Sequence, residues 1–201
     1  MEPTLTLAED VCARLCHDLG GPLGTLGGGL DLLDGDAPGA FGGEALAVAR
    51  EGADALRRRL RLWRSAVSGG TGPLARGEMA ELLDGTLGGG RVSADLSGLG
   101  DAVLTADMAR ATLIGAMLGA EALPRGGVVR IAGTPREVGI LPDGRGATWA
   151  PALASALAGE AVGGARDVLA PFLVALCRAS GARAALVPGE AGALWLILAA
   201  P

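Results

Sequence analysis

Apolar residues recur in the first third of the chain at steps of three and four positions, the spacing of one face of a helix. The first such stretch predicts a long helix from about Thr4 or Thr6 to Leu33, with an apolar face of Val11, Leu15, Leu19, Pro22, Leu26, Leu30 and Leu33. The second predicts a helix from about Glu44 to Val67, with an apolar face of Leu46, Ala49, Ala53, Leu56, Leu60, Trp63 and Val67. Residues 34–43, rich in glycine, predict a turn, so we expect an antiparallel hairpin. One hairpin buries only part of these faces, so we also expect pairing with a second copy into a dimeric four-helix bundle.

Beyond the hairpin the pattern alternates between helices and strands. Residues 68–77 are a linker by composition, and they divide the chain into a hairpin domain, residues 1–70, and a second domain, residues 75–201. In the second domain we expect helices at 78–87, 106–123, 149–157 and 167–180, and strands at 91–96, 128–133, 137–141, 184–187 and 193–198. This order predicts an α+β sandwich, with helices on one side of a mixed sheet.

Composition and charge narrow the function classes. The chain has 201 residues, of which 50% are apolar, enough for one large core or two small ones. The net charge of −5 disfavours a general nucleic-acid binder, which would show a basic field. No run of 18 apolar residues predicts a membrane span, and the first residues lack the basic start and apolar core of a signal peptide. We therefore expect a cytoplasmic protein that binds neither membrane nor nucleic acid, with its three cysteines reduced.

The chain's single histidine, His17, lies in the first predicted helix. At about 100° per residue it stands about 200° from Leu15, on the face opposite the apolar one, so the imidazole should meet solvent. Imidazole is largely neutral and nucleophilic near pH 7, which makes an exposed His17 a candidate for accepting a group. Asp18 follows directly and can orient a ring nitrogen or take its proton.

The residues after His17 distort the expected helix. Pro22 removes one helical hydrogen bond and should bend the helix just past the histidine. Each glycine on the outward face beyond His17 lowers the stability of the helix by about 0.8 to 1 kcal/mol relative to alanine. These glycines are Gly20, Gly21, Gly24 and Gly28. Two interpretations remain open: a glycine-rich composition, or a flat surface on which a partner's helix approaches the imidazole.

Two cysteines near the histidine raise the alternative of a haem or metal site. Cys12, Cys16 and His17 form C-x-x-x-C-H, one residue longer than the usual haem attachment spacing. A zinc site would need further ligands, and the chain has no second histidine. Both cysteines lie toward the flank of the apolar face, where we expect them to pack as small hydrophobic residues.

A basic cluster lies in the second predicted helix, and its members are Arg57, Arg58, Arg59, Arg61 and Arg64. If the turn centres near Ala37, the antiparallel neighbours of His17 fall near Arg57 to Arg61. The cluster is either a solvated helix face or a surface that offsets a phosphate's charge and steers an acidic pocket toward His17. Leu62 falls about 240° from Leu56, so we expect it to be exposed, as a docking contact or part of a dimer seam.

The string His17-Asp18-Leu19-x-x-Pro22-Leu23 resembles the phosphoacceptor box of histidine kinases. The wider stretch LCHDLGGPLGTLGGGLDLL, residues 15–33, is similar to histidine phosphotransferases of the ChpT type, a resemblance that covers almost the whole chain. It implies a homodimer that carries a phosphoryl group through His17, from the receiver domain of a hybrid histidine kinase to the aspartate of response regulators of the cell-cycle type. Asp18 would assist His17 in catalysis. The implied docking surface comprises Arg14, Gly20, Gly21, Thr25, Arg57, Arg58, Arg61 and Leu62.

The same resemblance implies a second domain similar to the ATP-binding domain of histidine kinases but without its ligands. That family needs an asparagine in the stretch 111–123 to hold magnesium, and this chain contains no asparagine. Asp143-Gly144-Arg145-Gly146 departs from the Asp-x-Gly-x-Gly box, and residues 163–166 are a poor remnant of a glycine-rich lid. We expect neither ATP nor a metal of its own, the receiver domains supplying Mg²⁺. The alternatives are an active histidine kinase and a non-catalytic scaffold that binds response regulators.

Overall fold

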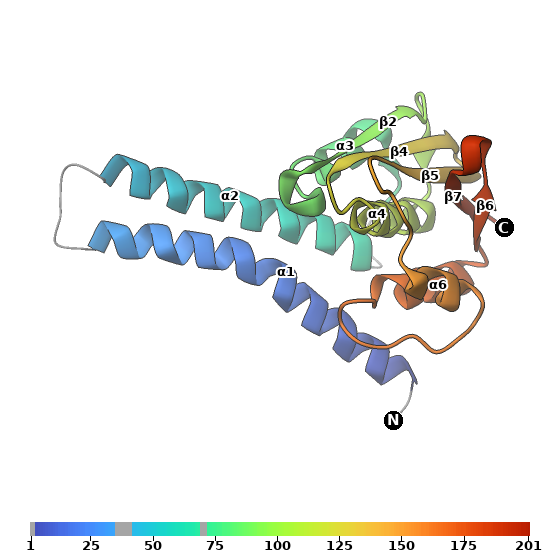
Figure 1. Cartoon of the computed structure of the whole chain (residues 1–201), viewed down its shortest axis with the longest axis horizontal. Coiled ribbons are helices and arrows are strands. Elements are labelled where there is room, and N and C mark those ends of the chain that lie inside the picture. Colours follow the sequence, from blue (N-terminus) through green and yellow to red (C-terminus); the bar gives the residue numbers. More distant parts are fainter. Residues whose placement is uncertain (1–2, 35–41, 69–71) are drawn as a thin grey trace.

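The computed structural model describes residues 3–34, 42–68 and 72–201, and it shows a long helical hairpin beside an α+β sandwich (Figure 1). The hairpin consists of α1, Pro3–Asp34, and α2, Gly42–Val67, which lie side by side. Both predicted helices are therefore confirmed. Most of the predicted turn, residues 35–41, lies outside the described residues, and Gly42 and Gly43 already belong to α2.

Close packing between α1 and α2 depends on two glycines. A Cβ on Gly52 would lie 2.5 Å from the backbone nitrogen of Leu26, and a Cβ on Gly29 would lie 2.5 Å from that of Ala49. Only glycine permits this approach, because any side chain would push the two backbones apart. Figure 1 shows α1 bending near its middle, and Pro22, the proline inside the helix, is buried there.

The sandwich follows the predicted order of elements. Its helices are α3, Arg76–Leu83, α4, Ala106–Glu121, α5, Pro151–Leu157, and α6, Leu169–Ser180, with the short 3₁₀ helices η1, Leu87–Gly90, and η2, Glu190–Gly192. Its strands are β1, Leu74–Ala75, β2, Val92–Gly98, β3, Val103–Leu104, β4, Gly127–Thr134, β5, Glu137–Asp143, β6, Arg183–Pro188, and β7, Leu194–Ala199. The expected α+β fold class is confirmed.

A mixed five-stranded sheet forms one layer, in the order β2-β4-β5-β7-β6. β2 runs parallel to β4, and the other neighbours are antiparallel. A second, two-stranded sheet pairs β1 with β3, and the sequence pattern missed both of these strands. The linker predicted over 68–77 is therefore wrong at its end: Leu74 pairs with Leu104, and the carboxylate of Glu78 accepts the N–H of Ala75 at 2.8 Å.

α4 is the central helix of the sandwich, and almost all of its residues from Met108 to Ala120 are buried. It approaches the sheet closely because Gly115 and Gly119 face it: a Cβ on Gly115 would clash with Ile140, and one on Gly119 would lie 3.1 Å from Val129. A helix that is apolar on all sides is typical of a core between layers. The other buried apolar residues of the sandwich, except Val168, join the same core.

The end of α2 packs into this core, which corrects one expectation. Leu62 is 3% exposed, and it clusters with Trp63, Ala66 and the buried residues of the sandwich. Its predicted exposure is wrong because the helical pattern was interpreted for a hairpin surrounded by solvent. The sandwich covers a second face of α2, a long-range contact that the periodicity does not encode. Within the described ranges, none of the helices is long and apolar enough to cross a membrane.

Replacing Gly52 with alanine should destabilise the fold. The added methyl group meets the backbone of Leu26, which cannot move without opening the hairpin. We expect Gly52→Ala to lower the free energy of unfolding by about 1–3 kcal/mol, measured by urea denaturation followed by circular dichroism. Gly28→Ala is the matched control, because a Cβ there meets open space and should raise stability by about 0.8–1 kcal/mol. Equal effects of the two substitutions would contradict the close-approach argument.

Candidate functional site

The imidazole of His17 projects from the middle of α1, close to the junction with the sandwich. Its side chain is 85% exposed, which confirms the predicted solvent-facing position. Nδ1 lies 3.3 Å from Oδ1 of Asp18. When Nδ1 carries the ring proton and donates a hydrogen bond to this carboxylate, Nε2 has no proton and its lone pair is available. The geometry therefore favours Nε2 as the nucleophilic atom.

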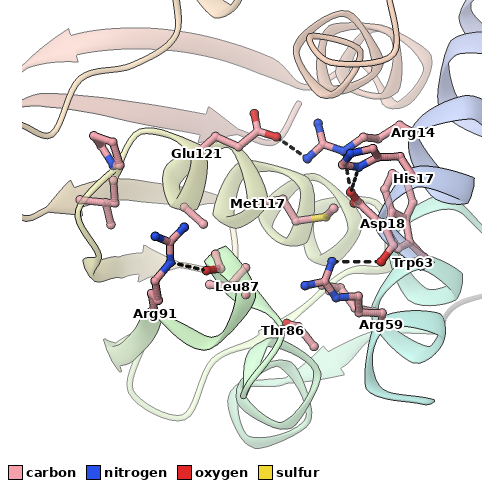
Figure 2. A pocket seen from close by; sticks show the side chains of 16 residues that line it. Arg14, His17, Asp18, Arg59, Trp63, Thr86, Leu87, Arg91, Met117 and Glu121 are labelled. Carbon is pink, nitrogen blue, oxygen red and sulfur yellow. Dashed lines mark hydrogen bonds and ion pairs between the residues drawn. The ribbon is translucent and has the colours of Figure 1, made fainter. Parts of the chain in front are cut away.

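The carboxylate of Asp18 is only 12% exposed, and donors from both hairpin helices hold it. Nε of Arg14, one turn earlier on α1, donates to Oδ1 at 3.0 Å. Nε1 of Trp63, on α2, donates to Oδ2 at 3.3 Å. A largely buried carboxylate needs such partners to offset its loss of hydration. Asp18 is thus fixed in place beside the histidine ring (Figure 2).

Arg14 joins α1 to the sandwich. Besides Asp18, its guanidinium donates to Oε1 of Glu121 at 2.6 Å and to the backbone oxygen of Arg166 at 2.9 Å. Burial lowers the pKa of Arg14, but the charges of Glu121 and Asp18, together with the hydrogen bonds to both carboxylates, outweigh burial and hold that pKa above its ordinary value. With its side chain 17% exposed, Arg14 lies in the junction. The structure places this predicted docking residue beside His17, with its guanidinium bound to other groups of the chain, and its role in docking stays a prediction.

The loop before α6 also binds to α1. The backbone N–H of Gly164 donates to Oδ2 of Asp10 at 2.9 Å, and Arg166 meets Arg14 through its carbonyl. Residues 163–166, the expected remnant of a glycine-rich lid, thus lie against the helix that carries His17.

Pro22 affects the site through the carbonyl of Asp18. In a helix the N–H of residue i bonds the carbonyl of residue i−4, so Pro22, which has no N–H, leaves the carbonyl of Asp18 without its helical partner. Nη1 of Arg59 donates to this oxygen at 3.1 Å. Arg59 was predicted as a member of the basic cluster, without a contact to Asp18 of its own. The sequence itself indicates that the carbonyl of Asp18 needs another donor, because Pro22 lies four residues later and has no N–H.

Two cavities flank the Arg14–Glu121 ion pair, and His17 lines both. The first, of about 430 Å³, is also lined by Arg59, Arg91 and Met117, and Figure 2 shows it between the hairpin and the sandwich. The second, of about 670 Å³, is bounded by residues near the start of α5 and by the loop before α6. The exposed imidazole is therefore accessible from the junction between hairpin and sandwich.

Other predicted docking residues fall into two groups. Gly20 and Gly21 are exposed with open space around them, and the exposed Thr25 donates its hydroxyl to the carbonyl of Gly21 at 3.3 Å. Arg57 and Arg61 are exposed, and Arg57 pairs with Asp54 at 2.9 Å.

The basic cluster does not meet His17 as a unit. Arg57, Arg58 and Arg61 line a separate pocket with Asp54 and Leu60. Arg58 is half-buried, and its Nε lacks a hydrogen-bond partner among the described residues. Arg59 is the member of the basic cluster that lines the first cavity beside His17.

The cysteines do not pack as expected. Cys12 and Cys16 are free and exposed, whereas Cys177 is buried, and burial raises the pKa of its thiol. In the described parts of the chain, no three histidine, cysteine or acidic side chains come together as metal ligands would.

The fold and the exposed histidine together define the class of protein: a helical hairpin presents a histidine beside an α+β sandwich. A solved structure, "1.7 Angstrom Structure of a Bacterial Phosphotransferase", has the same fold, with a TM-score of 0.80 and 21% identity over 98% of each chain. Full-length ShkA in complex with AMPPNP matches at a TM-score of 0.46 and 16% identity, over 96% of this chain and 45% of that one. No curated protein matches the sequence of this chain.

A family model, the histidine phosphotransferase C-terminal domain, matches residues 76–192, more than half of the chain. The chain therefore belongs to the histidine phosphotransferase family. The resemblance to ChpT-type phosphotransferases is confirmed, and a role in phosphotransfer is supported.

Glu121 makes the stability of the junction depend on pH. Burial raises the pKa of Glu121 above its ordinary value of 4.5, and the opposing charge of Arg14 does not cancel this effect. The folded protein thus favours the neutral carboxyl more than the unfolded chain does. This contribution to the free energy of unfolding is lost as pH rises through the raised pKa. Glu121→Gln, which keeps an acceptor for Arg14, should gain stability relative to the unmodified chain as pH rises above about 4.5. Urea unfolding at a series of pH values checks this, and an opposite trend would show that the ion pair dominates.

Proposed function

We propose that this chain relays a phosphoryl group from the receiver domain of a hybrid sensor kinase, through His17, to the aspartate of a response regulator. The observation that carries the proposal is the exposed imidazole whose Nδ1 faces a fixed carboxylate. In the tautomer that donates from Nδ1 to this carboxylate, Nε2 carries no proton and is open to a partner. By resemblance the partners are regulators of the cell-cycle type, in the cytoplasm.

The transfer chemistry needs little more than a nucleophile and its orientation. The lone pair of Nε2 attacks phosphorus in the receiver's aspartyl phosphate, an N–P bond forms, the bond from phosphorus to the carboxylate oxygen breaks, and the aspartate leaves as a carboxylate. The proton on Nδ1 stays there, hydrogen-bonded to Asp18. In the second transfer the regulator's aspartate attacks phosphorus, and the imidazole leaves as a neutral ring. Positioning is the main contribution of this chain.

Asp18 orients the imidazole in this scheme. Its Oδ1 accepts from Arg14 and faces Nδ1 of His17, while its Oδ2 is occupied by Trp63. A negative charge next to Nδ1 also stabilises the ring as phosphorylation draws electrons from it. The exposed Gly20 and Gly21, directly beyond His17, give a partner's backbone or helix close access.

We further propose that the hairpin pairs with a second copy into a four-helix bundle. Large apolar residues remain exposed along the described parts of the hairpin in the single chain, and they are Leu5, Leu23, Leu30, Leu32, Leu33, Leu46, Val48 and Leu60. Exposed apolar area of this extent is typical of an interface. A homodimer would present two copies of His17.

The phosphoryl source in this proposal is a receiver and not ATP. The sandwich instead uses the loop before α6 and Glu121 to bind Arg14 and Asp10 of α1. The partner receivers would bring the Mg²⁺ that phosphoryl transfer between carboxylate and imidazole requires. Two other functions, an active kinase and a phosphate-independent scaffold, are separated from this one by the following experiment.

Purified protein is incubated with labelled ATP alone, and separately with a receiver domain charged by labelled acetyl phosphate. We expect acid-labile label on the protein from the receiver only, and none on His17→Ala. Asp18→Asn keeps an acceptor but loses the charge, so it should slow transfer about tenfold or more. Label taken directly from ATP would indicate a kinase. Receiver binding without label would indicate a scaffold, provided that His17→Ala binds the receiver equally well.

A further inference from the structure

We propose that Arg59 is a positioning residue for phosphotransfer, because it replaces the helical hydrogen bond that Pro22 removes and so fixes the turn of α1 that carries His17. The inference rests on the proposed function, and it adds to that function a reason why the helix tolerates a proline so near the nucleophile.

The carbonyl oxygen of Asp18 lacks the N–H donor that a regular helix would supply. Pro22 cannot donate to the oxygen of Asp18, which stands one residue from His17. Nη1 of Arg59 lies 3.1 Å from that oxygen, across the hairpin. A carbonyl left unpaired in a half-buried position would favour local rearrangement of the turn. The guanidinium thus holds the main chain of Asp18 at the point where the helix is weakest.

α2 also holds the side chain of Asp18. Trp63, one turn after Arg59 on α2, donates to Oδ2 at 3.3 Å, and its ring is buried in the core. α2 therefore holds both the backbone and the carboxylate of Asp18. With both ends fixed, Oδ1 stays directed at Nδ1 of His17. Loss of the Arg59 contact should release the backbone end and loosen the orientation of the imidazole.

Arg59 also lines the cavity beside His17 (Figure 2), so a rival explanation is that its charge attracts the partner or its phosphate. The two explanations differ in their dependence on Pro22. In Pro22→Ala the new N–H can bond the carbonyl of Asp18, so a positioning role for Arg59 disappears. A role through charge would persist unchanged.

A double-mutant cycle at Pro22 and Arg59 tests the proposal. The readout is the rate of transfer from a saturating, phosphorylated receiver domain, so that docking affinity does not contribute. We expect Arg59→Ala to slow transfer about tenfold, the effect of losing a hydrogen bond from a charged donor. In the Pro22→Ala background the same substitution should change the rate by less than about twofold. Arg59→Lys, which keeps a donor and the charge, should recover part of the loss. Arg50→Ala, exposed on the same helix, is the control and should transfer normally.

A second readout does not depend on phosphotransfer. The chain has one histidine, so ¹⁵N-labelled histidine gives one pair of ring-nitrogen signals, which report the tautomer. We expect a predominant Nδ1-protonated ring in the unmodified chain, a mixture in Arg59→Ala, and recovery in the double variant. Failure of all transfer in the unmodified chain would refute the proposed function, while the tautomer signals would still test the inference.

Two results would overturn the inference: equal slowing by Arg59→Ala in both backgrounds, or ring signals unaffected by Arg59→Ala. If Arg59→Ala does not fold, the double variant decides. Its folding would support replacement of the lost hydrogen bond, and its failure to fold would show that Arg59 serves the fold independently of Pro22.

Discussion

A largely buried carboxylate needs hydrogen-bond donors or an opposite charge. In this molecule the partners of the Asp18 carboxylate link α1, α2 and, through Arg14, the sandwich. Arg14 and Trp63 donate to the two oxygens of this carboxylate, and Arg59 donates to the backbone carbonyl of Asp18. These donors come from α1 and α2, and Arg14 extends the linkage to the sandwich through Glu121. The cost of removing a carboxylate from water thus selects one arrangement of hairpin and sandwich. The imidazole of His17 is oriented as a consequence.

The sandwich takes part in this arrangement as a structural support. Its central helix is packed on the sheet through Gly115 and Gly119, and the end of the same helix carries Glu121 to the junction. The loop before α6 adds contacts to Asp10 and Arg14. A rigid core can therefore hold α1 at two residues, Asp10 and Arg14, which lie about one helical turn apart. In this way the sandwich helps to position a histidine that lies on another element.

Local patterns in the sequence predicted most of the fold, because helices and alternating strands carry their own periodicity. The long helices, the exposed face of His17 and the order of sandwich elements were accessible in this way. The expected exposure of Leu62 differed from the structure because the sandwich covers this residue, a contact between distant parts of the chain. Strands of two residues, such as β1 and β3, have too short a pattern to detect. The partner of the orphaned Asp18 carbonyl could be predicted in kind, as a donor, but its identity as Arg59 required the register of the hairpin.

The central claim is that His17 accepts a phosphoryl group at Nε2 while Asp18 holds Nδ1. It is tested most directly by phosphorylating the ¹⁵N-histidine-labelled chain from an unlabelled phosphorylated receiver and recording the ring nitrogens by NMR. The account predicts phosphorus coupled to Nε2 and a proton retained on Nδ1. Phosphorus on Nδ1, or on a residue other than the histidine, would contradict it.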